Sequence, residues 1–305
     1  MKILATLILS SGLYIMGLQA QDLFEARRLT DSPAREGFPS WSPGGDFIVY
    51  QYTMKSDTIG NNGLWIIAQD GSGNHQIFKG VAEHPVWSPD NSHIIYDADT
   101  GNNIKMIPPQ GGDPIGFLPD TIHIEKGGLP CWSPDASQIA YIEGSTRTLY
   151  VHSFLTGKST SVFKQEGIVP LPGCWSVNGK YLYTAQMEMP SRRSTIWKIS
   201  SDGKEKIQIK DHHENFYRHL ALSPDGSLLV YAALEGSYLG LFIMPAEGGQ
   251  SIPLAVSSTG HNEGPEWSPD GKKIAFSSSR SGNGDIWIME LDIKKINELL
   301  QKNNR

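Results

Sequence analysis

Three histidines, two acidic residues and one arginine lie within residues 211–219, in the segment KDHHENFYRHLALSPDG (residues 210–226). Imidazole, carboxylate and guanidinium groups this close together could bind a metal ion or transfer protons. His212 and His213 are adjacent, so on an extended loop their side chains point in opposite directions and do not readily share one ion. The segment is therefore either a site or a solvated polar loop, and its meaning depends on the unit to which LALSPDG belongs.

The LALSPDG sequence belongs to one of six copies of a repeat. The copies are FPSWSPGGDFIVY, HPVWSPDNSHIIY, LPCWSPDASQIAY, PGCWSVNGKYLYT, HLALSPDGSLLVY and GPEWSPDGKKIAF. Their fourth residues, Trp41, Trp87, Trp132, Trp175, Leu222 and Trp267, are 46, 45, 43, 47 and 45 residues apart. This regularity predicts a single repeat architecture across the chain.

Each repeat predicts four short strands. The first strand ends at Trp-Ser, and Ser-Pro-Asp-Gly has the residues of a type I turn. A second strand rich in β-branched and aromatic residues follows, such as HIIYDA or LLVYAA. A variable loop, a third strand such as GLWIIAQ, a tight turn and a weaker fourth strand such as HQIFKG complete the unit. Four strands in about 45 residues are typical of a β-propeller blade, whereas a solenoid, the alternative, has other repeat lengths or helical content.

The predicted fold is all-β: a six-bladed β-propeller of four-stranded antiparallel blades. The last repeat lacks a fourth strand, and the segment LFEARRLT (residues 23–30) can supply it. We therefore expect an N-terminal strand to complete the last blade and close the ring, which leaves no open sheet edge. We assign residues 21–305 to this single domain, with a helical or frayed tail at residues 292–305.

The first twenty residues have the layout of a secretory signal peptide. Lys2 precedes an apolar run from Ile3 to Leu18, and the small residue Ala20 follows. The run is shorter than the about 20 apolar residues that span a membrane; a retained anchor helix is the alternative. No cysteine follows the expected cleavage after Ala20, so we expect no lipid anchor. The sequence thus predicts a periplasmic or secreted protein without a transmembrane segment in its mature chain.

Composition excludes some classes of function. The formal net charge is −6 and no run of basic residues occurs, which argues against nucleic-acid binding. With 10% aromatic and 19% charged residues, the chain is globular rather than disordered. We expect a monomer.

The two cysteines, Cys131 and Cys174, occupy equivalent positions in neighbouring repeats. Packed sheets lie about 10 Å apart, whereas a disulfide requires Cα atoms within about 7 Å. We therefore expect two buried free thiols, with a disulfide as the alternative.

The repeat P-x-W-S-P-D-G followed by an apolar strand resembles the repeats of TolB-like β-propellers. The resemblance covers essentially the whole mature chain and departs from the pattern at Gly44, Val177, Asn178 and Leu222, which we interpret as packing variants. It implies a six-bladed propeller that binds an envelope protein or peptide. Similar repeats occur in the propeller domains of prolyl-oligopeptidase-type peptidases, but the chain has no G-x-S-x-G nucleophile elbow, so we exclude that activity.

The polar segment at residues 211–219 lies between two blades, on the face that carries the variable loops. Function on such scaffolds belongs to variable loops, so we expect a ligand-binding rim at the mouth of the central channel. Its candidate residues lie where first strands begin: Glu36, Glu83, His84, Arg218, His219, His261 and Glu263. Arg192, Arg193 and Arg218 could pair with an acidic ligand. A hydrated rim without a ligand is the alternative, because a propeller channel needs polar lining in any case.

Three functions follow from this rim. The first is a non-catalytic exported binding or scaffold protein whose partner enters the channel mouth. The second, implied by a similarity to secreted lyase propellers, is a polysaccharide lyase-like enzyme that acts on acidic glycans with His84, His219, His261 and Arg218. The third is a sugar-binding accessory protein of a polysaccharide-uptake system. We favour the first, predict no catalytic residue and no cofactor, and regard a divalent metal in the channel as compatible with the rim.

Overall fold

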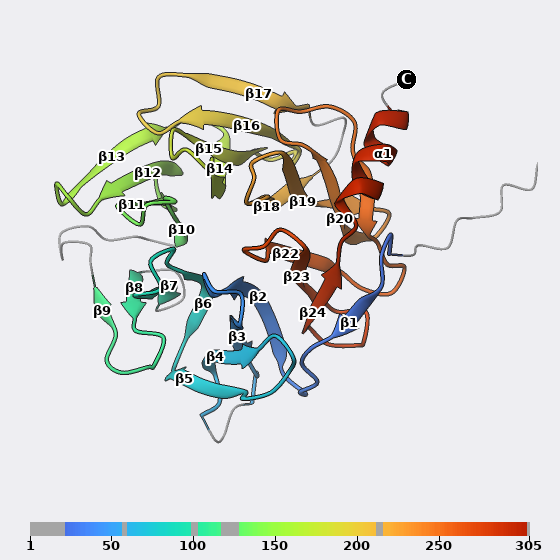
Figure 1. Cartoon of the computed structure of the whole chain (residues 1–305). Coiled ribbons are helices and arrows are strands. Elements are labelled where there is room, and N and C mark those ends of the chain that lie inside the picture. Colours follow the sequence, from blue (N-terminus) through green and yellow to red (C-terminus); the bar gives the residue numbers. More distant parts are fainter. Residues whose placement is uncertain (1–21, 57–59, 99–102, 117–127, 212–215, 304–305) are drawn as a thin grey trace, which may run out of the picture.

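The computed structural model describes residues 22–56, 60–98, 103–116, 128–211 and 216–303. Six four-stranded sheets surround a central axis (Figure 1), and within each sheet the strand order follows the chain, apart from the blade that the N-terminus completes. All neighbouring strands are antiparallel, as in the pair β2–β3. The predicted six-bladed β-propeller of four-stranded blades is confirmed.

The blades are numbered from the N-terminus. Blade 1 contains β2 (Arg35–Trp41), β3 (Phe47–Thr53), β4 (Gly63–Ala68) and β5 (His75–Lys79). Blade 2 contains β6 (Ala82–Trp87), β7 (Ile94–Ala98), β8 (Asn103–Ile107) and β9 (Ile115–Gly116). Blade 3 contains β10 (Gly128–Trp132), β11 (Gln138–Glu143), β12 (Thr148–Ser153) and β13 (Lys158–Phe163). Blade 4 contains β14 (Ile168–Trp175), β15 (Tyr181–Glu188), β16 (Ser194–Ser200) and β17 (Lys206–Lys210). Blade 5 contains β18 (Tyr217–Leu222), β19 (Leu228–Glu235), β20 (Tyr238–Pro245) and β21 (Ile252–Ala255). Blade 6 contains β22 (Asn262–Trp267), β23 (Lys273–Ser278), β24 (Asp285–Glu290) and β1 (Ala26–Arg28).

The Ser-Pro-Asp turn of each repeat is a hydrogen-bonded structural unit. In blade 2 the Ser88 hydroxyl donates to Asp90 Oδ1 (2.6 Å) and accepts the His93 N–H (2.9 Å). Hydrogen bonds from Ser88 and Ser92 lower the pKa of Asp90. The same pair of bonds recurs at Ser133, Ser176, Ser223 and Ser268. The motif therefore stabilises the turns on the face opposite the variable loops.

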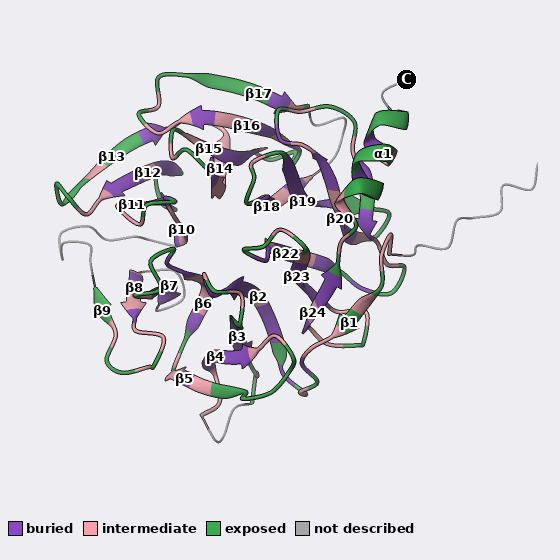
Figure 2. Ribbon diagram, viewed as in Figure 1, coloured by how far each residue is buried: buried purple, intermediate pink, exposed green. Residues whose placement is uncertain are grey.

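The repeated tryptophans connect neighbouring blades. The indole N–H groups of Trp132, Trp175 and Trp267 donate to the backbone carbonyls of Val86, Cys131 and Ala221, at 3.3, 3.1 and 3.1 Å. Each acceptor lies on the innermost strand of the preceding blade. Figure 2 shows the second strands of the blades mostly buried, in contrast to the outer strands β13 and β17. Burial between blades is thus the main role of these tryptophans.

The N-terminal strand β1 closes the ring, as predicted. It pairs with β24 through Ala26 and Met289, Arg27 and Ile288, and Arg28 and Trp287. The C-terminal helix α1 (Ile293–Asn303) packs beside this seam. Its residues Ile296 and Leu300 join a core cluster of blades 5 and 6, which Leu23 and Phe24 also contact. None of the helices among the described residues is long and apolar enough to cross a membrane.

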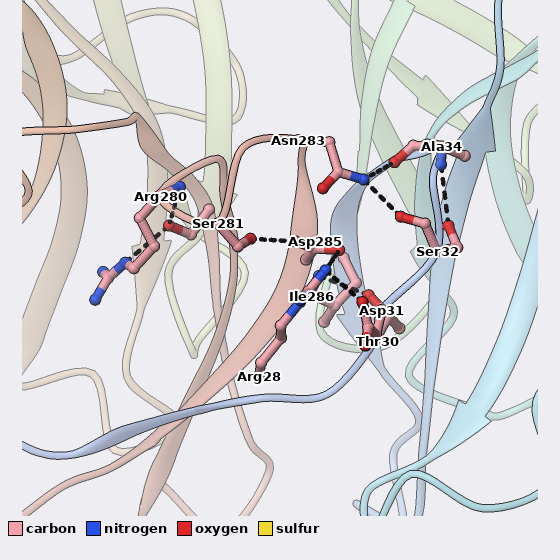
Figure 3. Close-up of polar contacts among 11 residues, drawn as sticks. Arg28, Thr30, Asp31, Ser32, Ala34, Arg280, Ser281, Asn283, Asp285 and Ile286 are labelled. Carbon is pink, nitrogen blue, oxygen red and sulfur yellow. Dashed lines mark hydrogen bonds and ion pairs between the residues drawn. The ribbon is translucent and has the colours of Figure 1, made fainter.

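A group of polar residues ties the N-terminal segment to blade 6 (Figure 3). We call Arg28, Thr30, Asn283 and Asp285 the closure cluster. Arg28 pairs with Asp285, whose carboxylate is 0% exposed, at 2.9 Å. Thr30 Oγ1 accepts the Ile286 N–H at 2.9 Å, and Asn283 donates to the carbonyls of Ser32 and Ala34, both at 2.6 Å. These bonds connect residues 28–34, which precede blade 1, with strand β24 of blade 6 and the loop before it.

Arg28→Ala should destabilise the ring more than an ordinary surface substitution. It leaves the buried Asp285 carboxylate without its cation, which costs about 2–4 kcal/mol of unfolding free energy. Asp31→Ala is the matched control, because this carboxylate also contacts Arg28 but is 84% exposed; it should cost less than about 1 kcal/mol. Urea unfolding of both variants measures the difference, and equal losses would show that the buried pair does not stabilise closure.

Candidate functional site

A bulge in the innermost strands directs one residue per blade toward the central axis. The residue three positions before the repeated tryptophan, or before Leu222 in blade 5, has a positive φ in blades 1, 2, 3 and 5: Phe38 (52°), His84 (48°), Leu129 (49°) and His219 (52°). The strand pairing shifts register at each of these positions. Left-handed backbone is costly for residues other than glycine, on the order of 1 kcal/mol each, and such strain concentrates at functional sites.

These four side chains constrict the channel between two cavities. The upper cavity, of about 680 Å³, opens on the face of the variable loops; the lower cavity has about 110 Å³. Phe38, His84, Leu129 and His219 line both. The Phe38 ring lies edge-on to His84 and His219, with centroids 4.3 and 5.2 Å apart. In blade 6 the equivalent residue is Gly264, where an added Cβ would lie 3.2 Å from the Phe38 ring, so the glycine leaves room for Phe38.

His84 and Asp97 form a paired imidazole and carboxylate in the wall of the upper cavity. His84 Nδ1 lies 2.8 Å from Asp97 Oδ2, which also accepts the Leu129 N–H at 3.1 Å. Asp97 is buried, and burial raises the pKa of its carboxyl group although both hydrogen bonds oppose the shift. An added Cβ at Gly128 would lie 2.1 Å from Asp97 Oδ1, so this position requires glycine. The pair fixes the imidazole with Nδ1 occupied and leaves Nε2 available to a ligand.

A second polar group connects blades 5, 6 and 1. Glu263, whose side chain is only 14% exposed, pairs with Arg35 at 3.1 Å and with Arg218. His219 Nδ1 accepts the Gly264 N–H at 3.3 Å. Burial, reinforced by the positive charge of Arg218, lowers the pKa of His219 well below its usual range. His219 is therefore neutral at pH 7, and its proton lies on Nε2.

The upper cavity combines a cationic side, formed by Arg35 of blade 1 and Arg218 of blade 5, with an apolar side. Four arginines line the cavity, namely Arg35, Arg147, Arg192 and Arg218. Neither Arg147 nor Arg192 forms an ion pair with any residue that the structure describes. The apolar side belongs to blades 3 and 4, whose loops also carry Arg147 and Arg192, and consists of Leu129, Ile142, Val169, Leu171 and Met187. A chain with a net charge of −6 thus has a cavity with an excess of positive charge.

The structure brings four of the seven predicted rim residues into the upper cavity: Glu83, His84, Arg218 and His219. Glu263 lies behind them and holds two arginines. Glu36 lies outside the cavity, 1% exposed and close to Thr30 and Ser32, where burial raises its pKa. His261 is also outside; it accepts the Leu239 N–H at 3.0 Å and lies edge-on to the Tyr238 ring.

Other sequence expectations have different outcomes. His212 and His213 lie outside the described residues. Arg35, Asp97 and Arg147 line the cavity and were not predicted; an acid within the apolar strand IIYDA was the available signal for Asp97. No group of three or more histidine, cysteine, aspartate or glutamate side chains in the described segments could hold a metal ion, so a channel metal stays a prediction. Both cysteines are free.

The side chain of Glu266 lines the lower cavity, where burial shifts the pKa of its carboxyl group. Burial raises the pKa of its carboxyl group to about 7. Between about pH 4.5 and 7 the folded protein then holds a proton that the unfolded chain has lost, so Glu266 lowers stability as pH rises through this range.

Glu266→Gln should therefore stabilise the protein at pH 8, by on the order of 2 kcal/mol, and much less at pH 5. Denaturant unfolding at both pH values measures the gain. Glu290→Gln, at an exposed position, is the control and should change stability equally at both. A gain that does not depend on pH would contradict the assigned pKa.

Comparisons of sequence find relatives that are less than 30% identical to this chain. No protein-family model matches it. An uncharacterized protein of Agrobacterium fabrum is 26% identical over 172 residues, which cover 53% of this chain and 54% of that protein. The Tol-Pal system protein TolB of Francisella tularensis is 29% identical over 100 residues, 32% of this chain and 23% of that protein. The chain thus aligns with about half of the first relative and less than a quarter of TolB.

Solved structures show the same architecture. TolB of Acinetobacter baumannii superimposes with a TM-score of 0.61 at 16% identity, covering 86% of this chain and 65% of that chain. An oligogalacturonate lyase in complex with manganese gives 0.58 at 15% identity, with coverages of 90% and 96%. Regucalcin of Agrobacterium tumefaciens, a calcium-binding protein, gives 0.61 at 13% identity, with coverages of 87% and 93%. At these identities the likeness concerns the fold, and the chain has the TolB-like six-bladed β-propeller fold.

Proposed function

We propose that the protein is an exported, non-catalytic binding propeller that takes an acidic ligand or partner segment into its upper cavity. The observation that carries the proposal is the convergence of Arg35, Arg147, Arg192 and Arg218 on one enclosed space. Export rests on the signal-peptide pattern of residues 1–20, and it would place the protein in the periplasm or outside the cell.

The charge balance of the cavity supports an anionic ligand. The Asp97 carboxylate is paired with the His84 imidazole, and the Glu263 carboxylate is paired with both Arg35 and Arg218. Glu83 is the other carboxylate in the described lining. Arg147 and Arg192 therefore have no carboxylate partner among the described residues, and a site partly shielded from water strengthens the attraction of guanidinium groups for an anion. Each guanidinium has five N–H donors in a planar fork, so Arg35 and Arg218 keep donors for a ligand after binding Glu263.

Prior orientation of the arginines also favours binding. Glu263 holds Arg35 of blade 1 and Arg218 of blade 5 on one side of the channel. A guanidinium that is already ordered loses less conformational entropy when it binds a carboxylate. The fold alone does not indicate an anionic ligand, because one fold supports many functions.

A second candidate function is proton transfer on the bound ligand, which the His84–Asp97 pair favours. A buried carboxylate fixes the imidazole tautomer, and the remaining nitrogen can accept a proton. The structural likeness to oligogalacturonate lyase makes a polysaccharide lyase-like reaction on acidic glycans the form to test, and a sugar-binding accessory role needs only the same cavity.

Arg218→Ala should weaken binding of acidic ligands at least about ten-fold, because it removes a partly buried guanidinium and leaves Glu263 paired with Arg35 alone. Thermal shift and calorimetry with acidic peptides and oligogalacturonates, beside neutral counterparts, measure this loss. Arg27→Ala is the matched control on the outer strand of blade 6 and should bind normally. Equal affinity of both variants, or no binding by any acidic compound, would refute an anion site in the cavity.

If the protein turns over an acidic glycan, His84→Gln and Asp97→Asn should each lower the rate about 100-fold or more, because general base catalysis contributes this much. The product of oligogalacturonate cleavage is measured by its ultraviolet absorbance. Both variants should keep most of their affinity, since the arginines remain. Unchanged rates in both variants would exclude the pair as the base.

A further inference from the structure

The geometry points to the free C-terminus of a peptide, with an apolar side chain at or near its last residue, as the ligand of the upper cavity. This inference rests on the proposed function and names its ligand class. It follows from the apolar side of the cavity beside its arginines, from the residues that line the cavity at its inner end and from the acceptors beside the arginines.

The apolar side of the cavity disfavours a glycan. Val169, Leu171 and Met187 of blade 4 face the site together with Ile142 of blade 3. A sugar acid carries hydroxyl groups around its whole ring, and those that contact this side would lose their hydrogen bonds to water without replacement. No tryptophan or tyrosine of the described chain lines the cavity. Of its two phenylalanines, Phe38 packs edge-on against His84 and His219, and the Phe216 ring lies against Arg218. A peptide with an apolar side chain would bury that side chain here and gain stability from the contact.

The floor of the cavity explains why the end of a chain fits better than its middle. Phe38, His84, Leu129 and His219 narrow the channel where the upper cavity meets the lower one. Phe38 is held between the two histidines by edge-on ring contacts. A segment that enters from the open face therefore ends near this constriction. The positive charge of Arg35 and Arg218 selects the carboxylate end over the ammonium end.

Acceptors beside the arginines suit the amide groups of a peptide. Glu83 lines the cavity next to His84, whose Nε2 is left open by the bond between Nδ1 and Asp97. Both can accept N–H groups of a peptide backbone. His219, neutral with its proton on Nε2, can donate to the terminal carboxylate beside Arg218. The volume of about 680 Å³ lies within the about 300–1,000 Å³ of sites that enclose small ligands, so the last few residues of a chain would be held.

The test uses the full chain and two pools of dye-labelled hexapeptides. Both pools have apolar residues at the last two positions; one ends in a free carboxylate and the other in an amide. Trigalacturonate is the glycan probe. We expect fluorescence anisotropy to show binding of the acid pool at least ten-fold tighter than the amide pool, with no competition by trigalacturonate. Arg218→Ala should abolish the preference for the acid, whereas Arg27→Ala should keep it.

Met187→Gln tests the apolar side separately. It should weaken binding of the acid pool several-fold while the melting temperature stays close to that of the wild type. Equal binding of both pools would overturn the inference. Binding of trigalacturonate that Arg218→Ala removes, without binding of the acid pool, would also overturn it but would uphold the proposed anion site. If neither peptide nor glycan binds, the inference and the proposed function both fail.

Discussion

The inner edge of the six innermost strands has no partner strand, and much of the molecule follows from this constraint. A backbone N–H group at a free sheet edge must donate a hydrogen bond to water or to a ligand, unless the residue there has no N–H group. Proline removes a donor, and Pro39, Pro85, Pro130 and Pro265 occupy the same position in four blades. The preceding residue takes up the bulge, often with a left-handed backbone. In blades 1, 2 and 3 the proline and the bulge together accompany the placement of Phe38, His84 and Leu129 at the axis, and in blade 5 the bulge alone places His219 there, because Leu220 follows it.

The charge that a ligand meets in the cavity depends on which side chains are paired with one another, rather than on the number of charged residues. Two of the carboxylates at the site are engaged, one with an imidazole and one with two guanidinium groups. His219 is kept neutral by burial and by Arg218. A ligand therefore meets arginines and neutral donors although the whole chain is acidic. Neither the net charge nor the residue types at the rim contain this information, because it depends on which side chains touch.

The fold could be predicted from the sequence because its signals are local and repeated. Ser88, Asp90 and Trp87 make their bonds within a few residues or with an adjoining blade, so the motif itself implies the geometry. The site is different, since a bulge changes which face the following residues occupy. Glu83 and Glu36 both precede the bulge but differ by one position in the repeat, since Glu83 lies four residues before Trp87 and Glu36 five residues before Trp41. Glu83 lines the cavity, whereas Glu36 is buried near the closure cluster. Asp97 and Arg147 come from a strand and a loop of other sheet positions, and only the assembled ring brings them to the axis.

The seam that closes the ring also bounds the candidate site, and this connects stability with binding. Asn283 holds the carbonyl of Ala34, and the next residue, Arg35, pairs with Glu263 across the junction of blades 1 and 6. The Glu36 N–H donates to the Gly284 carbonyl at 2.7 Å, which fixes the start of β2 from the other side. Arg35 is therefore positioned by blade 6, to which the chain returns only after five blades. In a repeat protein whose other junctions join consecutive units, this junction alone joins the two ends of the domain. A binding group placed there is correctly oriented only when the whole ring is closed, so the cationic side of the cavity depends on completion of the fold.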